Sequence, residues 1–250
     1  MKKAYRLFVV SDIHGHCTLL KKALAEAGFD ENDPSHLFVC CGDLFDRGPE
    51  NRKVYDYVRR LKHKILIRGN HDQRLVELLE SRQVGLHDEK NGTLKTVREF
   101  FGENAVDASG EIRLPKHGHL ADNLCRWIRG MKNYWETDRY VFTHGWLPLQ
   151  PNSNISTVRP DWRTVGEDVW RYARWLQWPL LYNAPSRIPG KTIVCGHRHT
   201  TMAHFLDPQR RPEDPGIFYG YGMIAIDAGT VLSGTVNVLV LEEEIEADDL

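Results

Sequence analysis

Ligand-type side chains recur in this sequence directly after apolar runs that are typical of buried strands. The densest stretch is 42–48, where Asp43, Asp46 and Arg47 follow the apolar run 37–41. Four other apolar runs lead into polar residues of the same kinds, which are Asp12 and His14; Asn70, His71 and Asp72; His144; and His197 and His199. One polar turn after a strand is ordinary. Five strand ends that carry carboxylates, imidazoles and an amide indicate a shared site.

These groups are suited to binding metal ions. Carboxylate, imidazole and amide oxygen ligands, with no thiolate among them, favour Mn, Fe, Zn or Mg and are not typical of a structural zinc site. The candidate ligands are Asp12, His14, Asp43, Asn70, His144 and His197. Six groups are too many for one catalytic ion with open positions, and they suit two divalent ions that share Asp43.

Such a pair of ions would support phosphoryl chemistry. Two divalent ions about 3.5 to 4 Å apart can hold a bridging hydroxide as nucleophile and clamp the oxygens of an in-line displacement at phosphorus. Two dications bring four positive charges, and Asp12 and Asp43 remove two. The double positive charge that remains suits a phosphate monoester dianion. Mn²⁺ is the expected metal, and Fe, Zn and Mg are the alternatives that the ligand types also allow.

Three units of strand, loop and helix must position the first ligands. The hydrophobic pattern predicts strands at 6–10, 37–41 and 64–67, with helices at 18–28 and 49–61 and a third helix after residue 72. Such repeated units imply parallel strands joined by right-handed crossovers. Ligands of open α/β sheets bind beyond the carboxyl ends of the strands, so the loops are expected to converge there.

A change of pattern from about 81 to 138 predicts a helical cap inserted beside the sheet. Polar and glycine-containing segments alternate there with short amphipathic stretches. His117 and His119 have the spacing of a metal pair, but no strand delivers them, and we expect a surface turn. With 250 residues, the chain is expected to form a single domain, 1–250, that includes this cap.

The second half predicts further strands and an aromatic segment. Apolar runs at 139–143 and 191–195 predict strands, and the runs 223–229 and 235–241 suggest antiparallel strands of a second sheet. The acidic residues 242–248 are expected to fray.

Residues 161–178 hold four of the seven tryptophans, interleaved with arginines. An amphipathic helix that packs these rings into the core is the preferred interpretation, and a stacking and anion-binding wall beside the site is the alternative.

Composition excludes several classes of protein. With 33 basic and 34 acidic residues, a formal net charge of -1 argues against a dominant nucleic-acid or membrane footprint. The five cysteines lie mostly in apolar runs, as expected in a reducing compartment. The N-terminal apolar run is too short for a signal peptide, and no stretch has the length of a membrane span. A cytoplasmic location is expected.

Together these motifs resemble a known family. The segments 12–15, 42–48, 69–72, 144–145 and 196–197 are similar in type and order to those of the phosphoprotein-phosphatase branch of the calcineurin-like metallophosphoesterases. That branch includes symmetrical diadenosine tetraphosphate hydrolases and small bacterial and phage protein phosphatases. The motifs span most of the chain, and the stretch with Asp46 and Arg47 separates this branch from the wider superfamily.

The resemblance implies a fold and a ligand set. The fold is α/β, a central β-sandwich with mixed sheets flanked by helices, with a dimetal site at the carboxyl ends of the strands. One metal would be held by Asp12, His14 and Asp43, and the other by Asp43, Asn70, His144 and His197.

The resemblance also implies catalytic roles. Arg47, together with Asn70, would bind the phosphate, a task for which the bidentate guanidinium is suited and Lys is a poor substitute. His71 would protonate the leaving group while Asp46 holds the imidazole. A second phosphate-binding arginine lies near a tryptophan-containing helix in this family, and both Arg171 and Arg174 fit that description loosely. His199 matches a metal ligand of the wider superfamily that protein phosphatases usually lack, so its role stays open.

The expected function is phosphomonoester hydrolysis by a serine/threonine-type protein phosphatase. The alternative is hydrolysis of diadenosine tetraphosphate or related nucleotides, for which the segment 161–178 would stack a base and hold the extra phosphates. The expected partner is therefore a phosphorylated protein or a nucleotide. A non-catalytic binding module is disfavoured because every motif position is occupied, and a nuclease is disfavoured by the near-neutral charge.

Overall fold

The first sheet begins with the apolar run near the N-terminus, which forms β1 (Lys3–Val10) in the computed structural model. The structure describes residues 2–107, 109–114, 119–151, 157–178 and 187–246. β1 pairs in parallel with β2 (His36–Cys40), and β2 pairs in parallel with β3 (Lys64–Leu66). The three repeated units therefore form parallel strands, as the sequence predicts.

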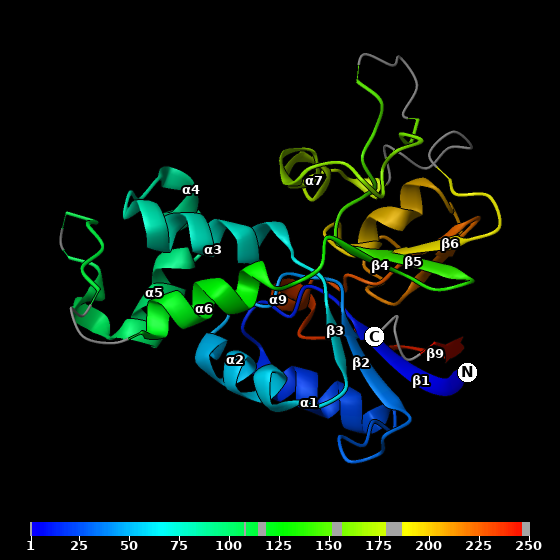
Figure 1. Ribbon diagram of the computed structural model, residues 1–250, viewed down its shortest axis with the longest axis horizontal. Helices are drawn as coiled ribbons and strands as arrows, with labels where there is room; N and C mark the ends of the chain where they lie inside the picture. Colours follow the sequence, from blue (N-terminus) through cyan, green and yellow to red (C-terminus); the bar gives the residue numbers. More distant parts are fainter. Residues whose placement is uncertain (1, 108, 115–118, 152–156, 179–186, 247–250) are drawn as a thin grey trace.

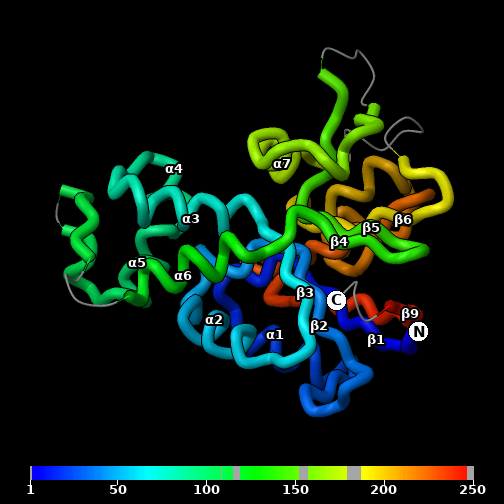
Figure 2. Tube along the Cα trace, in the orientation of Figure 1, coloured from blue at the N-terminus to red at the C-terminus, as the bar shows by residue number. Residues whose placement is uncertain are grey.

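A strand from the far end of the chain completes this sheet. β9 (Leu239–Ile245) runs antiparallel to β1, in the strand order β3-β2-β1-β9, and Figure 2 shows the C-terminal red segment beside the N-terminal blue one. The prediction that 223–229 and 235–241 pair with each other is wrong, and so is the prediction that the acidic tail frays from 242. An alternating pattern identifies a half-buried strand but carries no information about its partner.

The second sheet has five strands, in the order β4-β5-β6-β8-β7. They are β4 (Tyr134–Glu136), β5 (Tyr140–Thr143), β6 (Thr192–Cys195), β7 (Phe218–Gly220) and β8 (Met223–Ala225). β5 pairs in parallel with β6, and β6 in parallel with β8, while the outer strands are antiparallel to their neighbours. Three parallel strands therefore deliver their loops to one edge, as in the first sheet.

The two sheets face each other across a shared core. Leu7 and Val9 of β1 point toward the second sheet and join a cluster that includes Phe142 and Val194, whereas Phe8 points to the opposite face and packs beneath the helices. This alternation follows from the pleat of a strand. The expected sandwich of two mixed sheets flanked by helices is confirmed.

Most helices cover the outer face of the first sheet or extend from it (Figure 1). They are α1 (Cys17–Glu26), α2 (Asn51–Arg60), α3 (Asn70–Ser81), α4 (Leu86–Lys90), α5 (Thr93–Phe101), the 3-10 turn η1 (Glu103–Ala105) and α6 (Leu120–Arg129). α4, α5 and α6 lie in the segment 81–138 and group with α3, away from the sheets. His119 precedes α6 and is exposed, and His117 lies outside the described residues.

The tryptophan-rich segment packs against the outer face of the second sheet. Among the described residues of 161–178, α7 covers Glu167–Ala173 and a turn and non-helical residues follow it, so the single long helix expected there is wrong. Trp162, Trp170 and Trp178 are buried, as the packing interpretation predicts, whereas Trp175 keeps 42% of its surface exposed. The short helices η3 (Thr200–Phe205) and α9 (Thr230–Ser233) complete the described elements.

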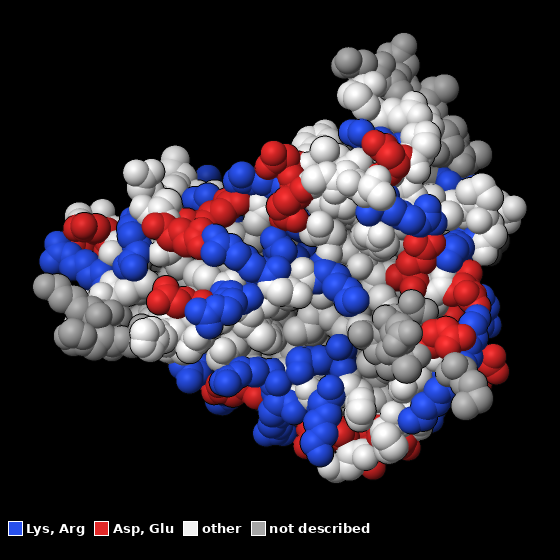
Figure 3. All heavy atoms as spheres, viewed as in Figure 1, with Lys and Arg blue, Asp and Glu red and all other residues white. Residues whose placement is uncertain are grey.

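The charge distribution on the surface and the state of the cysteines match what the composition predicts. On the face shown in Figure 3, basic and acidic side chains are interspersed. All five cysteines are buried and free. Within the described ranges, none of the helices has both the length and the apolar composition that a membrane span requires.

Candidate metal centre

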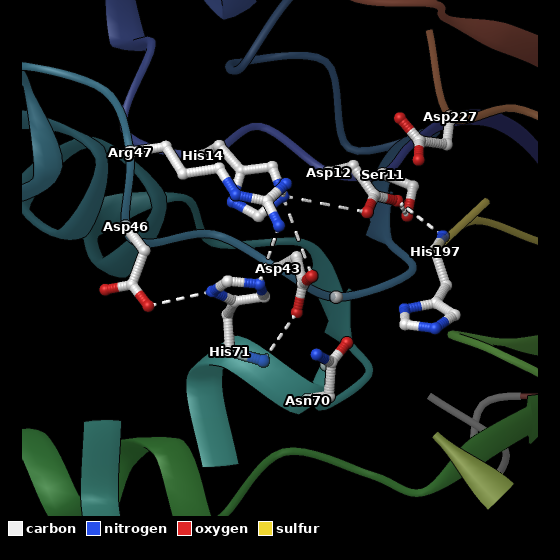
Figure 4. A network of polar contacts seen from close by, with 12 residues as sticks. Ser11, Asp12, His14, Asp43, Asp46, Arg47, Asn70, His71, His197 and Asp227 are labelled. Atoms are coloured by element: carbon white, nitrogen blue, oxygen red, sulfur yellow. Dashed lines mark hydrogen bonds and ion pairs between the residues drawn. The ribbon is translucent and has the colours of Figure 1, made fainter. Parts of the chain in front are cut away.

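The predicted ligands meet at the carboxyl edges of both sheets (Figure 4). Asp12 and His14 follow β1, Asp43 follows β2 and Asn70 begins α3 just beyond β3, while His144 follows β5 and His197 follows β6. Except for His197, each of these residues is almost wholly inaccessible to solvent. Because parallel strands place their carboxyl ends at one edge, residues that are up to 185 positions apart in the chain, such as Asp12 and His197, lie together.

The backbone is strained at these positions. Among the described residues other than glycine, a positive φ occurs at Arg82, which ends α3, and at six positions of the site: Asp12, His14, Asp43, Asp46, Arg47 and His197. A residue with a side chain pays roughly 1–3 kcal/mol for such a conformation, and it persists where surrounding structure holds it. Strain concentrated at the predicted site residues supports a functional constraint on the backbone there.

Two glycines allow the carboxylates to pack against the backbone. A Cβ at Gly69 would collide with the Asp43 carboxylate, and a Cβ at Gly196 would collide with the side chains of Ser11 and Asp12. Gly69 and Gly196 are therefore required because the carboxylates lie so close to the backbone that a side chain would not fit.

Asp43 lies between two groups of potential ligands. One group comprises His14, Asp43 and His71, the other comprises Asp43, His144 and His197, and the ligand atoms within each group are no more than 4.8 Å apart. The Oδ2 atom of Asp43 lies 3.7 Å from Nε2 of His14 and 3.4 Å from Nε2 of His144. This central place is the one expected for a bridging carboxylate.

Two histidines present their Nε2 lone pairs to the centre. Nδ1 of His14 lies 2.9 Å from the carbonyl oxygen of Phe45, and Nδ1 of His144 lies 2.8 Å from that of Cys41. Because a carbonyl oxygen only accepts, Nδ1 donates in both cases. Burial lowers the pKa of both rings, which favours the neutral form that binds metals. Fixing the tautomer in this way is typical of metal-ligating histidines.

The donor atoms fit divalent cations. The Nε2 atom of His144 lies 2.7 Å from Oδ1 of Asn70, so two lone pairs face each other at a distance that a cation would stabilise. Burial raises the pKa of Asp43 well above its ordinary value, with a further contribution from nearby Asp12, and the same two causes raise the pKa of Asp227. Buried carboxylates that repel one another are stabilised by bound metal charge.

A histidine, an aspartate and an arginine meet beside this group. Nδ1 of His71 lies 2.8 Å from Oδ2 of the fully buried Asp46. Burial lowers the pKa of His71, but the carboxylates of Asp43 and Asp46 outweigh it, so the pKa lies above its ordinary value. The Arg47 guanidinium spans the site, with Nη1 2.9 Å from Nε2 of His14 and Nη2 3.0 Å from Nε2 of His71.

His199, Arg171 and Arg174, whose roles the sequence leaves open, lie outside the two ligand groups. His199 is partly buried and lines a cavity of about 260 Å³ with His14 and Arg47, and a Cβ at Gly229 would come within 3.0 Å of its Nδ1 atom. Arg171 is exposed and forms an ion pair of 2.7 Å with Glu77. Arg174 is buried, and its guanidinium donates to Gln73, Asn133 and Glu167.

The contacts of Arg174 lead to a testable expectation about stability. Arg174→Ala should lower the free energy of unfolding by about 1–3 kcal/mol, because buried partners such as the Gln73 carbonyl lose their donor. Urea unfolding measures this change. The neighbouring exposed change Arg171→Ala should stay within about 0.5 kcal/mol. Unchanged stability in Arg174→Ala together with a raised KM for substrate would instead support the phosphate contact that the sequence suggests.

The structure shows contacts of Asp72, Asp227 and Asp46 that the sequence analysis did not predict. The Asp72 carboxylate accepts hydrogen bonds from the amides of Gly69, Asp43 and Leu44, and so holds the loop that carries Asp43. Asp227 lies near Asp12 in Figure 4 and follows the run 223–226, so the same strand-end pattern could have identified it. The sequence contains no comparable signal for the two α5 side chains that donate hydrogen bonds to Asp46.

Comparisons with known proteins agree with this geometry. A family model described as calcineurin-like phosphoesterase matches residues 5–201. Serine/threonine-protein phosphatase 1 of Salmonella typhimurium is 38% identical over 77 residues, which is 31% of this chain and 34% of that protein. The symmetrical bis(5'-nucleosyl)-tetraphosphatase of Buchnera aphidicola is 33% identical over 155 residues, which is 60% of this chain and 48% of the relative. The matched part thus spans about half or less of these relatives.

A solved structure supports the fold. The crystal structure of a putative diadenosine tetraphosphatase superposes with a TM-score of 0.52 at 17% identity, over 97% of this chain and 95% of the other. A likeness at this identity concerns the fold alone. The family model, however, covers most of the chain and all but the C-terminal part of the site, and its family implies divalent metal ions. The chain belongs to the calcineurin-like phosphoesterase family.

Proposed function

We propose that this chain is a metal-dependent phosphomonoester hydrolase of the serine/threonine protein phosphatase type. The observation that carries the proposal is the meeting of the His71–Asp46 pair and the Arg47 guanidinium beside two ligand groups that share Asp43. An ion site, a phosphate-binding cation and a proton donor are the parts that hydrolysis of a stable phosphate ester requires.

The ligand groups would hold two divalent ions, with Mn²⁺ as our choice. Asp12, His14 and Asp43 would bind the first ion, and the second would be bound by Asp43, Asn70, His144 and His197. When bound, such ions supply positive charge and an activated water for attack on phosphorus. The free and buried thiols fit the cytoplasmic location that we also propose.

Arg47 would orient the phosphate. Its two terminal nitrogens already point to the imidazoles of His14 and His71, so they face the space between the acid and the ligand set. A planar guanidinium can donate two parallel hydrogen bonds to phosphate oxygens. When Arg47 donates to phosphate in place of His71, the Nε2 atom of His71 becomes free to carry a proton.

His71 would then protonate the leaving alcohol. The Nε2 proton moves to the ester oxygen as the bond to phosphorus breaks, while the Nδ1 proton stays in its hydrogen bond with Asp46. The neutral imidazole afterwards regains a proton from water. The raised pKa of His71 keeps more of the ring protonated at neutral pH than an ordinary histidine.

A specific observation favours dinucleotide hydrolysis as a second candidate. The half-exposed ring of Trp175 lies 5.5 Å from the ring of His87 and 6.1 Å from that of His197, measured between ring centroids. His87 in turn lies 6.4 Å from His71. This line of rings beside the site offers a stacking surface for a base, and several relatives are named as symmetrical bis(5'-nucleosyl)-tetraphosphatases.

Parallel assays with Mn²⁺ separate the two candidates. We expect a higher kcat/KM for phosphoserine or phosphothreonine peptides than for diadenosine tetraphosphate. ADP as sole product from the dinucleotide, at a much higher kcat/KM than any peptide, would overturn the leading proposal. Trp175→Ala then reports on stacking, with the exposed Tyr172→Ala as control: a loss confined to Trp175→Ala and to the dinucleotide would support the second candidate.

A further inference from the structure

Asp46 is held by three side chains, and two of them come from α5. Its Oδ2 atom accepts hydrogen bonds from Nδ1 of His71 and from the hydroxyl of Thr93, each at 2.8 Å. Its Oδ1 atom accepts one from the hydroxyl of Thr96, also at 2.8 Å. Asp46, Thr93 and Thr96 are all fully buried. Both oxygens of the carboxylate are therefore committed to protein donors in a site that water does not reach.

The chain that precedes α5 packs against the same motif. A Cβ at Gly92 would come within 2.9 Å of the backbone nitrogen of Arg47, and Gly92 has a φ of +78°. Oδ1 of Asn91 lies 3.4 Å from Nη2 of Arg47 and accepts from it. The segment 91–96 thus contacts Arg47 by its backbone and side chains, in addition to its two hydroxyl contacts with Asp46.

A second connection runs from α5 to the backbone of Asp46. The amide nitrogen of Asp46 donates to Oδ1 of Asn51, and Nδ2 of Asn51 donates to Oε1 of Glu99 in α5. Asn51 also donates to the carbonyl oxygen of Gly48. Because α5 reaches both the backbone and the side chain of Asp46, the position of this helix determines where the carboxylate lies.

We infer that Thr93 and Thr96 are positioning residues for proton transfer, which makes the start of α5 part of the catalytic apparatus. The inference rests on the proposed role of His71 as the acid. A carboxylate that accepts from His71 alone could rotate about its Cβ–Cγ bond, whereas donors on both oxygens fix the plane of the group. The fixed plane holds the imidazole so that its Nε2 atom faces the leaving group.

Hydroxyl deletion tests this role with substrates that differ in their need for an acid. Thr93→Val should lower kcat on a phosphoserine peptide by about 10-fold, the lower end of the range for losing a direct outer partner of a site residue, because Thr93 acts on His71 only through Asp46. On 4-nitrophenyl phosphate, whose leaving group departs without a proton, kcat should fall by far less, and KM should change little on either substrate. Thr93→Ser restores the hydroxyl and should recover the peptide activity.

Val97→Ala is the matched control, because Val97 is a fully buried residue of α5 without a polar contact to Asp46. It should lower the melting temperature and leave the ratio of the two kcat values unchanged. In an Asp46→Asn background, Thr93→Val should have no further selective effect. A fully additive loss in that background, or equal losses of Thr93→Val on both substrates, would overturn the inference.

The same assay distinguishes failure of the inference from failure of the proposed function. If His71→Asn shows the loss that is selective for the peptide and Thr93→Val does not, only the role of the threonine is refuted. If His71→Asn itself lacks selectivity, the acid assignment fails first.

Discussion

Replacement of Asp43 by asparagine is expected to lower kcat/KM for a phosphopeptide by roughly 10³-fold or more. A bound divalent ion contributes several kcal/mol of transition-state stabilisation, and each 1.4 kcal/mol or so is a factor of ten in rate. Asp43 belongs to both ligand groups, so this single change weakens both metal positions. An amide keeps the shape of the side chain but brings neither the negative charge nor a second oxygen ligand.

Metal content separates this effect from misfolding. Elemental analysis of Asp43→Asn after dialysis against Mn²⁺ should show reduced occupancy, with a far-ultraviolet circular dichroism spectrum like that of the parent. Asp88→Asn is a matched control, since Asp88 is also a buried aspartate and pairs with Arg74 in a different part of the fold. It should keep its full metal content. A full complement of ions in Asp43→Asn would remove Asp43 as the bridge.

The His71→Asn variant is expected to keep its metals and to lose about 10²- to 10⁴-fold in kcat on a phosphoserine peptide, the range typical of general acid catalysis. The serine alkoxide is a poor leaving group at neutral pH and needs a proton, which the proposed mechanism assigns to His71. The loss on 4-nitrophenyl phosphate should be much smaller, because nitrophenolate leaves unprotonated. The difference between the kcat losses on the two substrates therefore measures the contribution of proton donation separately from that of the metals and the phosphate-binding groups.

His36→Asn controls for the substitution itself, since His36 lies at the start of β2 and accepts from the backbone of Asp30. Its kcat on both substrates should stay near that of the parent. Equal losses of His71→Asn on both substrates would contradict the acid assignment. Loss of bound metal in that variant would instead assign His71 to the ligand group in which it lies with His14 and Asp43.

The convergence of the candidate ligands could be predicted because each of these residues is tied to a local signal in the sequence. An apolar run identifies a strand, and parallel strands bring their carboxyl ends to a common edge, so Asp12 and Asp43 had to be close. The same logic applies to His144 and His197, which follow adjacent parallel strands of the second sheet. The rule depends on the order of elements and needs no knowledge of side-chain packing.

The failures share a different cause. The packing of the whole molecule determines which strand pairs with β9. The local hydrophobic pattern of β9 therefore does not predict its pairing with β1. Arg174 and Arg171 look alike in the sequence, yet one is buried among polar partners and the other is exposed. The hydroxyls of Thr93 and Thr96 contact Asp46 from 47 and 50 residues further along the chain. Such contacts arise from three-dimensional packing alone.

The most direct test of the proposed dimetal phosphohydrolase, with Asp43 as the bridging ligand, is the number of ions per chain measured together with turnover. Metal-free protein is titrated with Mn²⁺, and bound metal and phosphopeptide hydrolysis are measured on the same samples. Two ions per chain are expected at saturation, with activity that rises as the second position fills. Saturation at one ion per chain, or full turnover after the metal has been removed by a chelator, would contradict this description of the site.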